Sequence, residues 1–227
     1  MNSIITLDGY AASGKSTLAK LLAKKLGTVV LSTGEAHRIN AFNIQKNKID
    51  FSNEKILEEY LTSIDIKWHI KNERLAISID GIFIEDISNE DIGVVLPQVT
   101  RIPNVCNKFT SFYRSIDYSG ILVAEGHGLG NGIFPYAKLK FFCEASEQRR
   151  AERRAKQCGK DVNLVRAEMT YRDRSDMNRD INPIVKTEDM IVIDTENNNV
   201  EECLIMIERA LIEKNYINFG GKNEQNY

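Results

Sequence analysis

The sequence predicts an α/β fold built on a parallel β-sheet, and three observations support this class. Short apolar runs recur along the chain, and they are typical of strands covered on both faces. A glycine-rich loop follows the first of these runs and precedes a helical pattern. A strand, a loop, a helix and a further strand in this order indicate a βαβ unit, which requires parallel strands.

This unit and the turn that follows it are predicted from residues 4–34. Residues 4–8 form a β-rich run that ends at Gly9. A helix is predicted over residues 14–26, because its leucines recur at helical spacing and Gly27 then ends it: Leu18, Leu21, Leu22 and Leu26. A second strand over residues 29–31 is followed by a predicted polar turn at residues 32–34 and by another helical stretch.

Residues from about 50 to 95 show a different pattern. Three alternating or β-branched runs are predicted to be strands, at residues 64–70, 75–79 and 82–84. Asn72 lies in the first connection, and Asp80-Gly81 is a favourable pair for a tight turn in the second. We expect a small antiparallel insertion that is not part of the parallel core.

The α/β pattern then returns and continues to the end of the chain. Further core strands are predicted at residues 121–124, 139–142 and 190–193. The charged segment 146–179 is predicted to be helical, and residues 200–214 form an amphipathic closing helix. The polar residues 215–227 are predicted to be a frayed tail.

The composition of the 227 residues, 42% hydrophobic and 27% charged, is that of an ordinary globular protein. The net charge of −2 gives no reason to expect binding to nucleic acid or to a membrane surface. No apolar run reaches the ~20 residues of a membrane span, and no secretory signal is recognisable, so we expect a cytoplasmic protein. The cysteines form no Cys-x-x-Cys pair, which favours reduced thiols over a zinc site or disulfides.

The loop Gly9-Tyr-Ala-Ala-Ser-Gly14-Lys15-Ser16 matches the phosphate-binding pattern G-x-x-x-x-G-K-[ST] without a mismatch. Glycines let the backbone N–H groups turn towards phosphates, and the following helix presents its positive end to the same anion. Lys15 is suited to the β- and γ-phosphates of ATP, and Ser16 to Mg²⁺. The predicted ATP-binding residues of this loop are Gly9, Ala12, Ser13, Gly14, Lys15, Ser16 and Thr17.

A competing motif is Asn47-Lys-Ile-Asp50, which matches the guanine-reading N-K-x-D of GTPases. It lies before any late core strand and within a polar connection, so we interpret it as a solvated loop. A GTPase is therefore disfavoured.

With this loop placed, the chain resembles the bacterial cytidylate kinase family over about residues 3–214. Residues 31–38, Leu-Ser-Thr-Gly-Glu-Ala-His-Arg, are similar to the family's leucine-aspartate-serine-glycine-x-x-tyrosine-arginine segment, which faces the acceptor nucleotide. The predicted insertion falls where the family has a small extra sheet. The run Tyr171-Arg-Asp-Arg-Ser-Asp-Met-Asn-Arg179 is similar to the family's late segment of arginines and aspartates.

The resemblance implies a P-loop fold with a core of five parallel strands. It also implies one kinase domain over residues 1–214, with its core at 1–40, 95–148 and 180–214. The acceptor-binding insertion would be at about 41–95, and a helical lid at about 149–179. The implied reaction is Mg²⁺-dependent transfer from ATP to CMP or dCMP, and we expect a monomer.

The resemblance also implies roles for individual residues. Arg38, with its planar fork, would hold the acceptor phosphate beside Thr33 and His37. Arg172 and Arg179 would close over the phosphates, and Asp176 would meet the acceptor sugar. Arg153 or Arg154 would flank ATP, and Glu125, at the end of a core strand, would order the hydration shell of Mg²⁺. The alternative for the arginines is a solvated helix face with ion pairs to Glu152 and Glu168.

The match fails at positions that would read cytosine. Residues 125–130 read Glu-Gly-His-Gly-Leu-Gly, so His127 replaces a phosphate-binding arginine and Gly128 a cytosine-binding aspartate. Pro97 and Cys106 stand where the family has serine and arginine, and His37 stands where it has tyrosine. Proline, cysteine and glycine cannot supply the missing charged or bidentate contacts, so an altered acceptor is expected: another nucleotide, a modified pyrimidine nucleotide or a different small phosphorylated metabolite. His127 remains a candidate anion ligand if it is protonated, or else a residue of a glycine-rich turn. A non-catalytic ATP-binding sensor is the alternative from another functional class.

Overall fold

One eight-stranded β-sheet forms the centre of the computed structural model, which describes residues 3–87, 92 and 94–216. The strands are β1 (Ser3–Gly9), β2 (Val29–Ser32), β3 (Ile66–Lys71), β4 (Arg74–Ile79), β5 (Ile82–Phe83), β6 (Ile121–Gly126), β7 (Leu139–Glu144) and β8 (Ile191–Asp194). The α-helices are α1 (Lys15–Lys25), α2 (Thr33–Lys46), α3 (Glu54–Ser63), α4 (Leu96–Val99), α5 (Pro103–Ser115), α6 (Glu147–Cys158), α7 (Val162–Met177) and α8 (Val200–Glu213). The predicted tail lies almost wholly outside the described residues.

The five strands predicted for the parallel core pair in the order β2-β6-β1-β7-β8, all parallel. These five strands confirm the predicted parallel core. The separation of the insertion from this core was wrong, however. β4 pairs with β2 at Val30 and Arg74, so β3, β4 and β5 extend the same sheet. Pairing β2 in this way satisfies backbone groups that an edge strand would leave open.

The turns of the insertion follow from residues that tolerate a positive φ. Asp80 and Gly81 have φ angles of 53° and 78°, as a tight hairpin turn between β4 and β5 requires. This confirms the turn predicted for that pair. The polar turn predicted at residues 32–34 was wrong, because α2 already begins at Thr33. The charged segment after β7 forms two helices, and α6 ends at Cys158, where the following Gly159 adopts a left-handed conformation.

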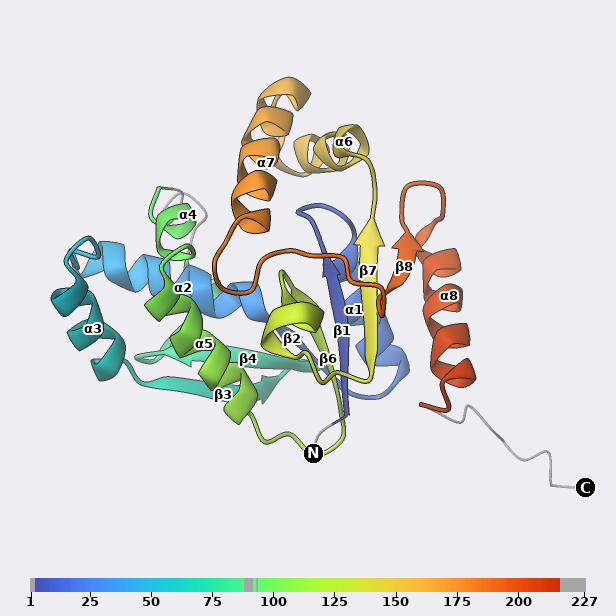
Figure 1. Cartoon of the computed structure of the whole chain (residues 1–227), viewed down its shortest axis with the longest axis horizontal. Coiled ribbons are helices and arrows are strands. Elements are labelled where there is room, and N and C mark those ends of the chain that lie inside the picture. The colour runs from blue at the N-terminus through green and yellow to red at the C-terminus, as the bar shows by residue number, and fades with distance from the viewer. Residues whose placement is uncertain (1–2, 88–91, 93, 217–227) are drawn as a thin grey trace, which may run out of the picture.

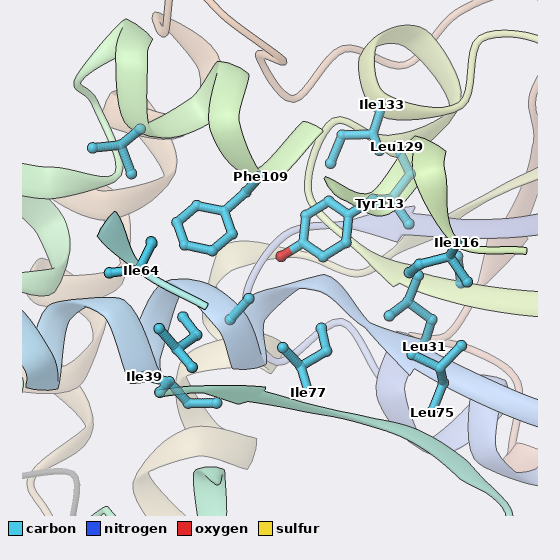
Figure 2. Close-up of a cluster of buried hydrophobic side chains, with 14 of the residues drawn as sticks. Leu31, Ile39, Ile64, Leu75, Ile77, Phe109, Tyr113, Ile116, Leu129 and Ile133 are labelled. Atoms are coloured by element: carbon cyan, nitrogen blue, oxygen red, sulfur yellow. The ribbon is translucent and has the colours of Figure 1, made fainter. Parts of the chain in front are cut away.

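Two hydrophobic clusters cover the two faces of the sheet. Alternate residues of a strand point to opposite faces, so Leu31 belongs to one cluster and Val30 to the other. Figure 2 shows the first cluster, in which Phe109 and Tyr113 of α5 pack towards Ile39 of α2 and Ile77 of β4. The second cluster packs α1 and α8 against the opposite face.

The carboxyl ends of β1, β6 and β2 meet at one edge of the sheet, where Asp8 pairs with Gly126 and Ser32 with Glu125. α6 and α7 lie above this edge (Figure 1). In open α/β sheets, ligands bind at this edge. Among the described residues, no helix is long and apolar enough to cross a membrane.

Candidate active site

The phosphate loop connects β1 to α1 and is shaped by its glycines. Gly9 has a φ of 146°, and a Cβ atom there would lie 2.5 Å from the Cys143 carbonyl oxygen, so only glycine fits. Gly14 and Ala12 also have positive φ angles, of 89° and 58°. Positive φ is costly for alanine, so the surrounding contacts must hold this loop in shape.

Protein donors hold two carbonyl groups of this loop. The Tyr10 carbonyl accepts hydrogen bonds from the Ser13 N–H, at 3.2 Å, and from Lys15 Nζ, at 3.1 Å. The Ser13 carbonyl accepts one from Thr195 Oγ1 at 2.9 Å. Burial lowers the pKa of Lys15, although the charge of Glu125 acts in the opposite direction. Lys15 therefore lies at the base of the loop as a desolvated cation, and such a group gains from a phosphate partner.

Glu125 lies at the end of β6, between hydroxyl groups of α1 and β2. Ser16 Oγ donates to its Oε2 atom at 2.8 Å, and Ser32 Oγ donates to its Oε1 atom. A hydroxyl and a carboxylate side by side are oxygen ligands of the kind Mg²⁺ prefers. Among the described residues, no group of three or more His, Cys, Asp or Glu could hold a metal ion. The oxygen atoms of Ser16 and Glu125 fit a Mg²⁺ ion that takes its other ligands from phosphates and water.

Asp8 was not predicted, and it supports the loop that follows β6. Its carboxylate accepts hydrogen bonds from the Leu129 and Gly130 N–H groups, at 2.7 and 2.8 Å. Burial raises the pKa of Asp8 to about 6, although both hydrogen bonds act against this. A carboxylate at the end of an apolar strand was the sequence signal that could have identified it.

His127 meets Arg172 and Asp176 of α7 and Arg179, which lies just beyond that helix. Asp176 of α7 lies 3.0 Å from His127 Nδ1, 3.0 Å from the Arg179 guanidinium and 3.7 Å from Arg172 Nε. Burial alone would raise the pKa of Asp176, but these neighbours outweigh it and lower the pKa to about 2. Burial and the charge of Lys15 lower the pKa of His127 to about 3, so its imidazole is neutral at pH 7. His127 is thus a hydrogen-bonding group and not a cation.

α2 carries three predicted acceptor residues. The Thr33 carbonyl accepts a hydrogen bond from the Tyr113 hydroxyl at 2.6 Å, which fixes the start of the helix. The His37 ring packs against Phe109 with its centroid 4.9 Å away, and burial together with the charge of Arg179 lowers the pKa of His37 to about 4.

Arginines from different elements converge on Arg38. Burial lowers the pKa of the Arg38 guanidinium, and the charges of Arg172 and Arg154 lower it further. Both guanidiniums therefore lie close enough to Arg38 to repel its charge. Mutual repulsion of this kind is relieved by a bound anion.

Arg153 contacts the other end of the site. It donates to Thr195 Oγ1 at 3.3 Å and also to the Thr195 carbonyl, just after β8. Thr195 was not predicted, and it connects Arg153 with the Ser13 carbonyl of the phosphate loop. Arg153 thus lies beside the loop, on the side predicted for ATP.

A cleft of about 1380 Å³ brings these groups together. Of the predicted site residues, the lining includes Ala12, Gly14, Lys15, Ser16, Thr17, Thr33, His37, Arg38, Glu125, His127, Arg153, Arg154, Arg172, Asp176 and Arg179. Gly9 and Ser13 do not line it and instead shape the loop from behind. The cleft therefore holds a phosphate loop, a candidate Mg²⁺ site and converging arginines.

A family model described as cytidylate kinase matches residues 5–212. The chain belongs to the cytidylate kinase family. It is 31% identical over 216 residues to a cytidylate kinase of Aeromonas salmonicida (strain A449), covering 91% of this chain and 93% of that protein. It is 33% identical over 217 residues to a cytidylate kinase of Yersinia pestis (strain Pestoides F), covering 92% of each. An uncharacterized protein from Eubacterium ventriosum ATCC 27560 shares the fold, with a TM-score of 0.52, 14% identity and coverage of 94% and 99% of the two chains.

One departure from the family resemblance, Gly128, has a steric explanation in the structure. Gly128 has a φ of 66°, and a Cβ atom there would lie 2.2 Å from the Asn182 carbonyl oxygen, so this position cannot carry a side chain. The thiol of Cys106, in α5, donates to the carbonyl of Thr100, which follows α4, at 3.2 Å. Pro97 and Cys106 both line the cleft.

Proposed function

We propose that the protein transfers the γ-phosphoryl group of ATP to CMP or dCMP. Membership of the cytidylate kinase family supports this activity. The observation that carries it is the convergence of Arg38, Arg154 and Arg172 on the cleft that also holds Lys15. Nothing in the comparisons favours an altered acceptor over CMP or dCMP.

In the proposed reaction, a phosphate oxygen of the acceptor attacks the γ-phosphorus of ATP. A new P–O bond forms as the bond to the β,γ-bridging oxygen breaks, and ADP leaves with that electron pair. Catalysis of such a transfer consists mainly of positioning and of stabilising charge on the moving group. Lys15 and the N-terminus of α1 are suited to the donor phosphates, and Arg38 to the acceptor phosphate.

Ser16 and Glu125 would hold Mg²⁺, which when bound neutralises charge on the phosphates. Arg172 of α7 and Arg179, just beyond it, would approach the moving group once anions compete with Asp176 for them. Asp176 then becomes available to the acceptor sugar. We propose that α6 and α7 act as the lid of a single kinase domain.

The test is release of ADP from Mg-ATP with a panel of acceptors: CMP, dCMP, UMP, AMP, GMP and pyrimidine nucleotides modified on the base. We expect kcat/KM to be highest for CMP or dCMP. Turnover restricted to another acceptor would instead support the altered pocket suggested by Pro97, Cys106 and Gly128. A lack of turnover with every acceptor, together with tight ATP binding, would favour the non-catalytic sensor.

A further inference from the structure

A buried ion pair lies behind the phosphate loop, outside the residues used above. Arg150 of α6 and Asp173 of α7 are 5% and 6% exposed. Arg150 Nη1 donates to Asp173 Oδ2 at 2.6 Å. A buried charge pair is costly to desolvate, so hydrophobic residues of similar volume would often give equal stability. Stability alone is therefore a weak reason for this pair.

The pair holds one peptide unit of the phosphate loop. Arg150 Nη1 also donates to the Ala11 carbonyl at 3.2 Å. Burial raises the pKa of Asp173, while the charge of Arg150 and the Ala11 N–H, which faces the carboxylate, lower it. The N–H and carbonyl groups of Ala11 thus both face this ion pair.

The rest of the guanidinium is fixed as well. Arg150 Nε donates to the Ala145 carbonyl at 3.2 Å, and the guanidinium lies 5.0 Å from the centroid of the Tyr10 ring. Its contacts therefore reach the end of β7, α7 and the loop. A planar group with five donors in a fixed arrangement can make these contacts together, which a lysine cannot.

Ala11 precedes Ala12, the loop residue with a φ of 58°. Such a conformation persists only where its surroundings enforce it. We propose that Arg150 and Asp173 are positioning residues, which hold the Ala11 peptide so that the phosphate loop stays in the conformation that binds ATP. The inference rests on the proposed function only in taking the loop as the ATP site.

The experiment compares Mg-ATP binding by calorimetry in the whole chain and in the double variant Arg150→Met with Asp173→Leu. This variant removes both charges and keeps side-chain volume, so it should stay folded. We expect an ATP Kd about 100-fold higher, the effect of a small misplacement of binding groups. CMP binding without ATP should be unchanged.

A matched control is the exposed ion pair of Glu147 and Arg166, which also joins α6 to α7, at a distance of 2.7 Å. Unlike Arg150, this pair is not a hydrogen-bond partner of Ala11. The double variant Glu147→Gln with Arg166→Gln should bind ATP as the unchanged protein does. If the Arg150/Asp173 variant does not fold, Arg150→Lys takes its place in the same ATP-binding measurement. Lysine keeps the positive charge but lacks the planar guanidinium that makes these contacts together.

An unchanged ATP Kd in the folded variant would overturn the inference. Equal weakening of ATP and CMP binding would do so too, because it would indicate a general structural role. Failure of the unchanged protein to phosphorylate CMP would contradict the proposed function alone, since the ATP comparison needs no acceptor.

Discussion

His127 Nδ1 lies 3.0 Å from Asp176 Oδ2, and this contact joins the segment after β6 to α7 across the cleft. The pair consists of a neutral imidazole and a carboxylate, because the pKa of His127 is lowered to about 3 and that of Asp176 to about 2. An arginine at position 127, which the family resemblance leads us to expect, would carry a permanent charge here. At neutral pH, the chain thus has one cation fewer beside Lys15.

This relationship predicts a pH-dependent stability. An unfolded histidine takes up a proton near pH 6.5, whereas folded His127 does so only at about 3. The unfolded chain therefore binds more protons between these values, and stability is lost as the pH falls below about 6.5. In this window the free energy of unfolding should fall less steeply with pH in His127→Asn than in the unchanged protein. The difference between the two slopes should be up to about 1.4 kcal/mol per pH unit.

The measurement is urea denaturation at pH 7.5, 6 and 5. Asparagine keeps an N–H donor for Asp176, which stays ionised throughout this range. His37→Asn is the parallel variant, because the pKa of His37 is lowered to about 4, which gives the same sign. Equal pH slopes for the unchanged protein and His127→Asn would contradict a neutral His127.

Glu125 is predicted to set the Mg²⁺ requirement. Glu125→Gln keeps the shape of the side chain but removes the charge beside Ser16. We expect a higher Mg²⁺ concentration for half-maximal activity and a loss of kcat/KM of about 100-fold. Glu125→Asp should restore part of this loss. The control is Glu144→Gln at the end of β7, where the exposed carboxylate lies 3.0 Å from Lys186 Nζ. An equal change in the Mg²⁺ concentration for half-maximal activity in this control would contradict a specific role of Glu125.

Arg38 is predicted to act on the acceptor and not on ATP. Arg38→Lys keeps the charge but loses the planar fork, so the KM for CMP should rise about 10-fold while the KM for ATP stays unchanged. Lys46→Ala, at the exposed end of the same helix, provides the control. An increase confined to the KM for ATP would indicate that Arg38 binds the phosphates of ATP, and would contradict the prediction.

The parts of the fold and site that the sequence predicted depend on local patterns. Strand periodicity and the phosphate loop are encoded within a few residues, so the parallel core and Lys15 could be read directly. The pairing of Val30 with Arg74 could not, because it joins distant strands. Arg150, Asp173 and Thr195 were missed for the same reason: their partners in the phosphate loop are remote in sequence.

The glycines after β6 show a related limit. From the sequence, Gly128 was interpreted as the loss of an aspartate. The structure instead gives a steric reason for glycine, because the backbone of Asn182, more than fifty residues away in sequence, lies against this position. In Gly128→Ala, the methyl group would meet the Asn182 carbonyl and the backbone would keep a positive φ of 66°. Left-handed backbone alone costs about 1–2 kcal/mol in a residue with a side chain.

We therefore expect Gly128→Ala to lose at least about 2 kcal/mol of unfolding free energy, measured by urea denaturation. Gly34→Ala is the matched control, because a Cβ atom there meets nothing within 4 Å and the residue lies in α2. Alanine should stabilise that helix by about 0.5–1 kcal/mol. If Gly128→Ala were as stable as Gly34→Ala, Asn182 would have to move away at little cost. The steric reason for glycine at position 128 would then be wrong, and the lost aspartate would again need a functional explanation.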